Sequence, residues 1–83
     1  MARDTAVGIV QRTVDGKHGP YAVASSESLG NVTFSLDPTV WLEKDPPERG
    51  EEVVLSDLRK KRAGWRAHSA RFLRPSDSNQ QGD

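Results

Sequence analysis

The chain has 83 residues, which is enough for one domain that buries about 60% of its unfolded surface. It has no cysteine, so a disulfide framework and a thiolate metal site are excluded, and its two histidines lack the spaced partners that a zinc site needs. Twelve basic and twelve acidic residues cancel, so the total charge indicates no partner.

The charges are distributed unevenly along the chain. Residues 37–57 hold seven acids and two bases, whereas residues 59–74 hold seven bases and no acid. Because charges act locally, the second segment can create a positive field despite the neutral total. Its bases are Arg59, Lys60, Lys61, Arg62, Arg66, Arg71 and Arg74.

No segment is typical of a membrane span or a secretory leader. The apolar runs are far shorter than the roughly 20 residues of a span, and Met1–Val10 lacks the apolar stretch of a signal peptide. We therefore expect a cytoplasmic protein without membrane contact.

The first predicted element is a strand over Thr5–Val14, which is rich in valine and isoleucine and can bend at Gly8. Met1–Asp4 before it is expected to be a frayed terminus. Asp15–Pro20 predicts a turn, because its Asp-Gly pair favours positive φ and its proline cannot donate to a sheet.

A hairpin is predicted next. Two short apolar runs, Tyr21–Ala24 and Val32–Leu36, flank a connection rich in serine, glycine and asparagine. In the second run, apolar residues alternate with Thr33 and Ser35, so one face can be buried and the other exposed. Phe34 is expected in the core.

The second half of the chain predicts one helical turn and two further strands. Asp37–Leu42 begins with an N-capping aspartate and a proline at the first helical position, which favours a short helical turn. Glu43–Gly50 is a proline-rich loop. Glu52–Leu58 and Trp65–Leu73 are strands joined by a basic turn over Arg59–Gly64.

These elements predict an all-β domain over residues 5–74, a small five-stranded antiparallel barrel with one short helical turn after the third strand. Closure suits a short chain because it removes the sheet edges that invite association. The alternative is a three-stranded sheet with loosely attached segments. Pro75–Asp83 has no apolar side chain to anchor it and is predicted to be a disordered tail.

Five pieces at matching spacing carry a family resemblance. Gly8–Val10 is similar to a G-x-V strand start, and Lys17–Ala24 and Val32–Leu36 stand where two ribonucleoprotein-type motifs would lie. Gly50 with Val53 resembles a G-x-x-V piece, and Gly64–Ala70 is similar to G-P-Q-A-x-N-V. With these pieces the chain resembles the cold-shock domain family, a five-stranded OB-type barrel that binds single-stranded RNA and DNA.

The chain resembles a divergent member that lacks most of the family's binding-face aromatics. Arg12 and Thr13 stand where the family has Trp and Phe, and Val23 replaces a second exposed aromatic beside Tyr21. Since stacking on an aromatic ring contributes about 1–3 kcal/mol per base, the expected binding is weak, strongly salt-dependent and of low sequence specificity.

The resemblance implies a single-stranded nucleic-acid site on one face of the barrel. Stacking would come from Arg12, Tyr21, Trp65 and His68, phosphate contacts from Lys17, Arg66 and Arg71, and hydrogen bonds to base edges from Thr33 and Ser35.

Other interpretations of the same residues stay open. Tyr21 could cover the edge of the core, Trp65 could cap the barrel end, and the cations could be ordinary solvated side chains. Trp41 is expected to pack in the core or against a loop. In a rival function the barrel is a protein-interaction module, in which the acidic loop Glu43–Glu52 or the basic turn meets a partner and Trp41 is the anchor. We expect a monomer, with self-association through a free strand edge as the alternative.

Catalysis has little support in the sequence. General acid–base chemistry needs convergent groups, whereas the carboxylates gather in a proline-rich loop and the serines at 25, 26 and 28 have no nearby base. No phosphate-binding glycine loop or metal-ligand spacing is present. We expect a protein that is not an enzyme and has no cofactor.

Overall fold

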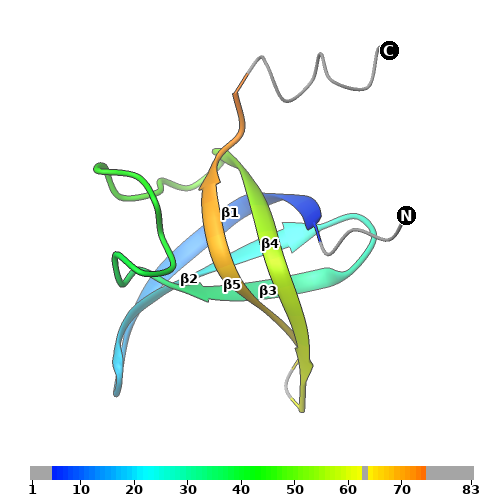
Figure 1. Cartoon of the computed structure of the whole chain (residues 1–83), viewed down its shortest axis with the longest axis horizontal. Coiled ribbons are helices and arrows are strands. Elements are labelled where there is room, and N and C mark those ends of the chain that lie inside the picture. The colour runs from blue at the N-terminus through cyan, green and yellow to red at the C-terminus, as the bar shows by residue number, and fades with distance from the viewer. Residues whose placement is uncertain (1–4, 63, 75–83) are drawn as a thin grey trace.

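The computed structural model describes residues 5–62 and 64–74 and shows five β-strands that close into a barrel (Figure 1). Their order around the barrel is β1-β2-β3-β5-β4, and β4 pairs with β1 to complete the closure. The closed five-stranded barrel expected from the sequence is therefore confirmed. The strands are β1 (Thr5–Gly16), β2 (Gly19–Ser26), β3 (Gly30–Ser35), β4 (Glu52–Lys61) and β5 (Gly64–Phe72).

One seam of the barrel is parallel. β3 and β5 pair in the same direction at Val32 with Trp65 and at Thr33 with Arg66, whereas the other four seams are antiparallel. The expectation of a wholly antiparallel sheet is therefore wrong at this seam. Its cause is the connection over residues 36–51, which carries the chain across the barrel so that β5 returns beside β3.

The inward faces of the five strands form one apolar core. β2 and β5 contribute small alanine side chains to this core. The large side chains that fill it include Phe34, which is 0% exposed, and Trp41, which is 5% exposed. Their ring centroids are 5.7 Å apart, and Phe72 meets Trp41 edge-on at 4.9 Å. The core position expected for Phe34 is confirmed. The buried cluster comprises Val10, Ala22, Ala24, Val32, Phe34, Trp41, Val53, Leu55, Ala67 and Ala70.

The helical turn predicted after β3 is not seen in the described residues. Residues 38–40 form a single hydrogen-bonded turn, in which the Asp37 carbonyl accepts the Trp41 N–H at 2.9 Å and the Asp37 carboxylate accepts the Thr39 N–H at 3.1 Å. Trp41 then makes a parallel bridge with Ala70 of β5. The sheet contact and the burial of the indole hold the chain extended after this turn, so a helix does not form.

The strand boundaries differ from the predicted ones mainly at β4. This strand continues through Arg59–Lys61, which the sequence placed in a turn, and it bends at Asp57, whose φ is +51°. The expected frayed terminus and disordered tail lie outside the described residues. No helix in the described part of the chain is long and apolar enough to cross a membrane.

Candidate nucleic-acid interface

Cross-strand pairing places one row of side chains over the outer surface of the barrel. Thr33 of β3 pairs with Val23 of β2 on one side and with Arg66 of β5 on the other. Val23 in turn pairs with Arg12 of β1, across a register shift that follows Val10. Because paired residues share a face of the sheet, the two arginines lie on the same outer face as Thr33.

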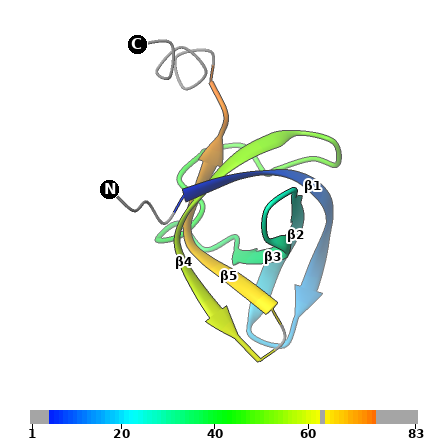
Figure 2. The same cartoon turned by 90° about the vertical axis from the view of Figure 1, so that its right-hand side faces the viewer.

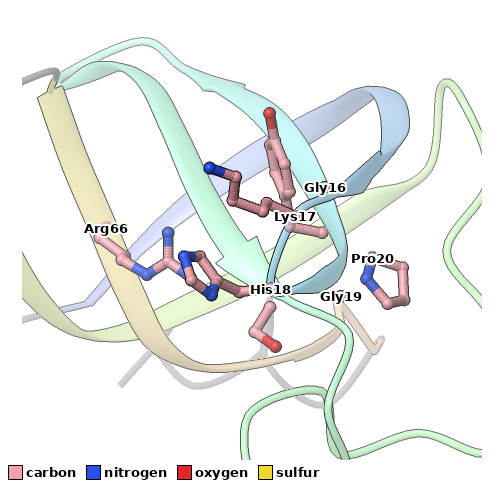
Figure 3. Close-up of a pocket in the computed structure, with 8 residues that line it drawn as sticks. Gly16, Lys17, His18, Gly19, Pro20 and Arg66 are labelled. Atoms are coloured by element: carbon pink, nitrogen blue, oxygen red, sulfur yellow. The ribbon is translucent and has the colours of Figure 1, made fainter.

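A first hollow of about 150 Å³ lies between the β1–β2 turn and β5 (Figure 3). Tyr21 and Ser35, which are paired neighbours on β2 and β3, contribute to its wall. Arg66 extends from β5 toward His18 of the turn in Figure 3. The lining residues are Gly16, Lys17, His18, Gly19, Pro20, Tyr21, Ser35 and Arg66.

The ring of Tyr21 lies against Gly16 of β1. A Cβ added at Gly16 would stand 2.9 Å from the Tyr21 Cε1, which is closer than real contacts allow. Tyr21 is half-buried, while its neighbour Ala22 points into the core with 0% exposure. The ring therefore rests on the β1 backbone at the edge of the first hollow and outside the core.

A second hollow of about 130 Å³ lies on the other side of Arg66. Its lining residues are Asn31, Thr33, Lys61, Gly64, Trp65 and Arg66. Trp65 is half-buried, packs against the core and carries the Lys60 ammonium 5.7 Å from its ring centroid. Trp65 therefore packs against the core and also lines the hollow, and its predicted stacking role stays a prediction.

Arg66 lines both hollows, so the two hollows adjoin at this residue. We call the residues that line the two hollows the Arg66 groove. The β1–β2 turn and the adjoining ends of β4 and β5 project to the same lower side of the molecule in Figures 1 and 2. Residues of the turn line the first hollow, and residues at these strand ends line the second.

Six of the nine predicted site residues line the Arg66 groove. They are Lys17, Tyr21, Thr33, Ser35, Trp65 and Arg66. Neither hollow includes the other three. Arg12 lies in the same cross-strand row beyond Val23, the His68 Nδ1 lies 3.3 Å from the Asp57 carbonyl where β4 bends, and Arg71 donates to the Phe72 carbonyl at 3.3 Å.

Sequence reasoning missed groove residues that only the barrel brings together. His18 falls in the predicted turn Asp15–Pro20 and Lys61 in the predicted basic turn Arg59–Gly64, and neither they nor Asn31 are among the predicted site residues. The predicted OB-type topology could have identified residues in the two loops, because the β1–β2 and β4–β5 loops of five-stranded OB barrels border the same binding face.

The cations that line the groove are not paired with carboxylates of the described residues. Within residues 5–62 and 64–74, Lys17, Lys61 and Arg66 form no ion pair, whereas Arg59 contacts Asp57 at 3.2 Å and Arg74 contacts Glu43 at 2.6 Å. The groove therefore presents positive charge that is not neutralised by neighbouring carboxylates. No group of three possible metal ligands occurs among the described residues.

Comparisons of the chain with models of protein families, with curated proteins and with solved structures find no significant match.

Proposed function

We propose that this protein binds single-stranded nucleic acid in the Arg66 groove, as a divergent cold-shock-like OB barrel. The observation that carries the proposal is one arginine, Arg66, that lines both hollows and forms no ion pair with another described residue, with Tyr21 at one hollow and Lys61 at the other. The strand order, and a groove on β2 and β3 between two loops, are typical of OB barrels that bind oligonucleotides.

Phosphate contacts supply most of the affinity in this proposal. Arg66 has five N–H donors that can clasp a phosphate, and Lys17 and Lys61 stand at the two ends of the groove. Each contact with a single strand releases counterions and steepens the salt dependence by about 0.7 in log–log slope. Three such contacts give a slope of about −2.

One base stacks on Tyr21, and the barrel exposes few other aromatic rings on which further bases could stack. Phe34 and Trp41 are in the core, and Val23 is 8% exposed where the family has an aromatic. A single platform contributes about 1–3 kcal/mol. The proposed binding is accordingly weak to moderate, with little sequence preference.

Titration of short fluorescent single-stranded RNA and DNA at two salt concentrations tests the proposal. We expect micromolar affinity at low salt and a slope near −2. Chemical-shift mapping should place the largest changes on Tyr21, Ser35 and Arg66. Absence of binding at micromolar protein and low salt overturns the proposal.

A protein-interaction module is the second candidate, favoured by a separate hollow of about 250 Å³ beside Trp41. Leu36, Pro38, Trp41, Glu43, Lys44, Pro46 and Pro47 line it. Because the indole is 5% exposed, Trp41 is a wall of this hollow and does not protrude as an anchor. An apolar side chain of a partner would fill it, and chemical shifts that change around Pro46 and Pro47 on adding a partner would support this function.

A further inference from the structure

We propose that the Arg66 groove selects RNA over DNA, because polar side chains on β3 hydrogen-bond to the 2′-hydroxyl of ribose. This inference rests on the proposed function and adds the class of nucleic acid. The side chains are Asn31, Thr33 and Ser35, which we call the β3 polar row.

The β3 polar row faces the groove along its whole length. Its members alternate with Val32 and Phe34, both of which are 0% exposed in the core. Asn31 and Thr33 line the second hollow, and Ser35 lines the first. Residues two apart on a strand are separated by about 6.8 Å, so the row offers hydrogen-bonding groups at a regular spacing beside an extended chain.

The row has hydrogen-bonding capacity that the fold does not use. Within the described residues, neither the Thr33 hydroxyl nor the Asn31 amide makes a hydrogen bond. Every buried side-chain polar atom in this part of the chain has a hydrogen-bond partner, so a hydroxyl without one is not buried. The Thr33 hydroxyl is therefore accessible to solvent. The Ser35 Oγ accepts the Asp37 N–H at 3.0 Å, which leaves its own O–H free to donate into the groove.

The position of Arg66 indicates which part of a nucleotide meets this row. Arg66 pairs directly with Thr33 across the β3–β5 seam. A phosphate held by the guanidinium brings its attached sugar toward the neighbouring hydroxyl. The 2′-hydroxyl is both donor and acceptor, as is the threonine hydroxyl, and it distinguishes RNA from DNA.

The scarcity of aromatic rings favours contact with the sugar over contact with the base. Tyr21 and the imidazole of His18 are the aromatic rings of the first hollow, and Trp65 of the second is half-buried with Lys60 over its ring. A strand with few stacked bases is held mainly through its backbone. Sugar and phosphate then provide the contacts, which predicts RNA selectivity without sequence specificity.

The test compares matched oligouridine and oligodeoxyuridine, which differ only in the 2′-hydroxyl. Binding is measured by fluorescence anisotropy for the unaltered protein and for Thr33→Val and Ser35→Ala. Valine keeps the shape and strand preference of threonine. The matched control is Thr5→Val, an exposed threonine that pairs with Ser56 on the β1–β4 side of the barrel.

We expect the unaltered protein to bind the ribo-oligomer several-fold more tightly. Thr33→Val should weaken ribo-oligomer binding by about threefold to tenfold, the range for one hydrogen bond, and leave deoxy binding unchanged. Thr5→Val should change neither. If the RNA preference came from a difference in stiffness between the two oligomers, Thr33→Val would show the same preference. A reduced preference in this variant therefore reports the contact with the sugar.

Two results overturn the inference and leave the proposed function standing. One is equal affinity of the unaltered protein for both oligomers, and the other is an RNA preference that persists in both Thr33→Val and Ser35→Ala. Binding of neither oligomer overturns the proposed function, and this inference with it. Thermal unfolding of each variant confirms that the barrel is intact.

Discussion

The Arg66 groove and the acidic connection over residues 36–51 differ in how their polar groups are used. In the connection, the Trp41 Nε1–H donates to the Asp45 carbonyl at 2.8 Å. Glu43 Oε2 accepts the Phe72 N–H at 3.1 Å and pairs with Arg74 at 2.6 Å. In the groove, Lys17, Lys61 and Arg66 form no ion pair with another described residue.

This difference separates a region that holds the fold from a region that can hold a ligand. A polar group that is already hydrogen-bonded within the protein contributes to stability, and its loss is felt on unfolding. A cation or hydroxyl with unused capacity contributes little to folding and can contact a partner. Substitutions in the connection should therefore change stability, and substitutions in the groove should change binding.

The largest expected effect is in the connection. Trp41→Ala should lower the free energy of unfolding by about 3–5 kcal/mol, because the indole stacks on Phe34, meets Phe72 edge-on and fills the core. Trp41→Phe keeps a ring and loses the hydrogen bond to Asp45, so its loss should be about 1–2 kcal/mol. Urea denaturation measures both.

Unchanged stability of Trp41→Ala would contradict a role of the connection in holding the fold. A change of nucleic-acid affinity in Trp41→Phe, measured well below its unfolding transition, would contradict the separation of the connection from the binding groove.

Arg66→Met should have the next largest effect, and on binding. Charge-assisted hydrogen bonds contribute about 1.5–3 kcal/mol, so affinity for single-stranded RNA should fall by about tenfold to a hundredfold. The slope of affinity against salt should become shallower by about 0.7. Anisotropy titrations over a salt series measure both quantities.

Arg49→Met is the matched control for this prediction. Arg49 is an exposed arginine of the acidic connection, and its loss should leave the affinity and the salt slope unchanged. Equal weakening by both variants would show that the total charge matters and the groove does not.

Gly16→Ala should weaken binding by a smaller factor. The new methyl group would lie 2.9 Å from the Tyr21 Cε1, so the ring must move from its place on β1. We expect about a threefold loss, below that of Tyr21→Ala, which removes a stacking platform worth about 1–3 kcal/mol. Tyr21→Phe keeps the ring and should bind normally. If Gly16→Ala left the affinity unchanged, the position of the Tyr21 ring would not matter for binding, which would contradict its proposed role.

Glu43→Gln should have the smallest effect. The amide oxygen of glutamine can still accept the Phe72 N–H, while the ion pair with the half-exposed Arg74 is lost. Because exposed ion pairs contribute little, the free energy of unfolding should fall by less than about 1 kcal/mol. Nucleic-acid affinity should not change. Weaker nucleic-acid binding by Glu43→Gln would show that the acidic connection takes part in binding together with the Arg66 groove.

Local patterns predicted much of the barrel and part of the groove. The alternation around Phe34 correctly oriented β3, because residues two apart on a strand share a face. The same alternation pointed Thr33 and Ser35 outward, where they line the hollows. The prediction of a helical turn after Asp37 was wrong. It rested on a capping pattern of a few neighbouring residues, whereas the conformation there depends on the long-range contact of Trp41 with β5.

Local sequence patterns were enough to place five strands approximately, to assign the buried face of β3, and to locate the basic residues between positions 59 and 74. Only the tertiary structure decided that β5 runs parallel to β3, which sets Arg66 beside Thr33. It also decided that His18 and Lys61, far apart in sequence, border the same groove. The physical reason is that strand formation depends on neighbours along the chain, whereas a binding surface depends on which strands pair, and barrel closure determines that pairing.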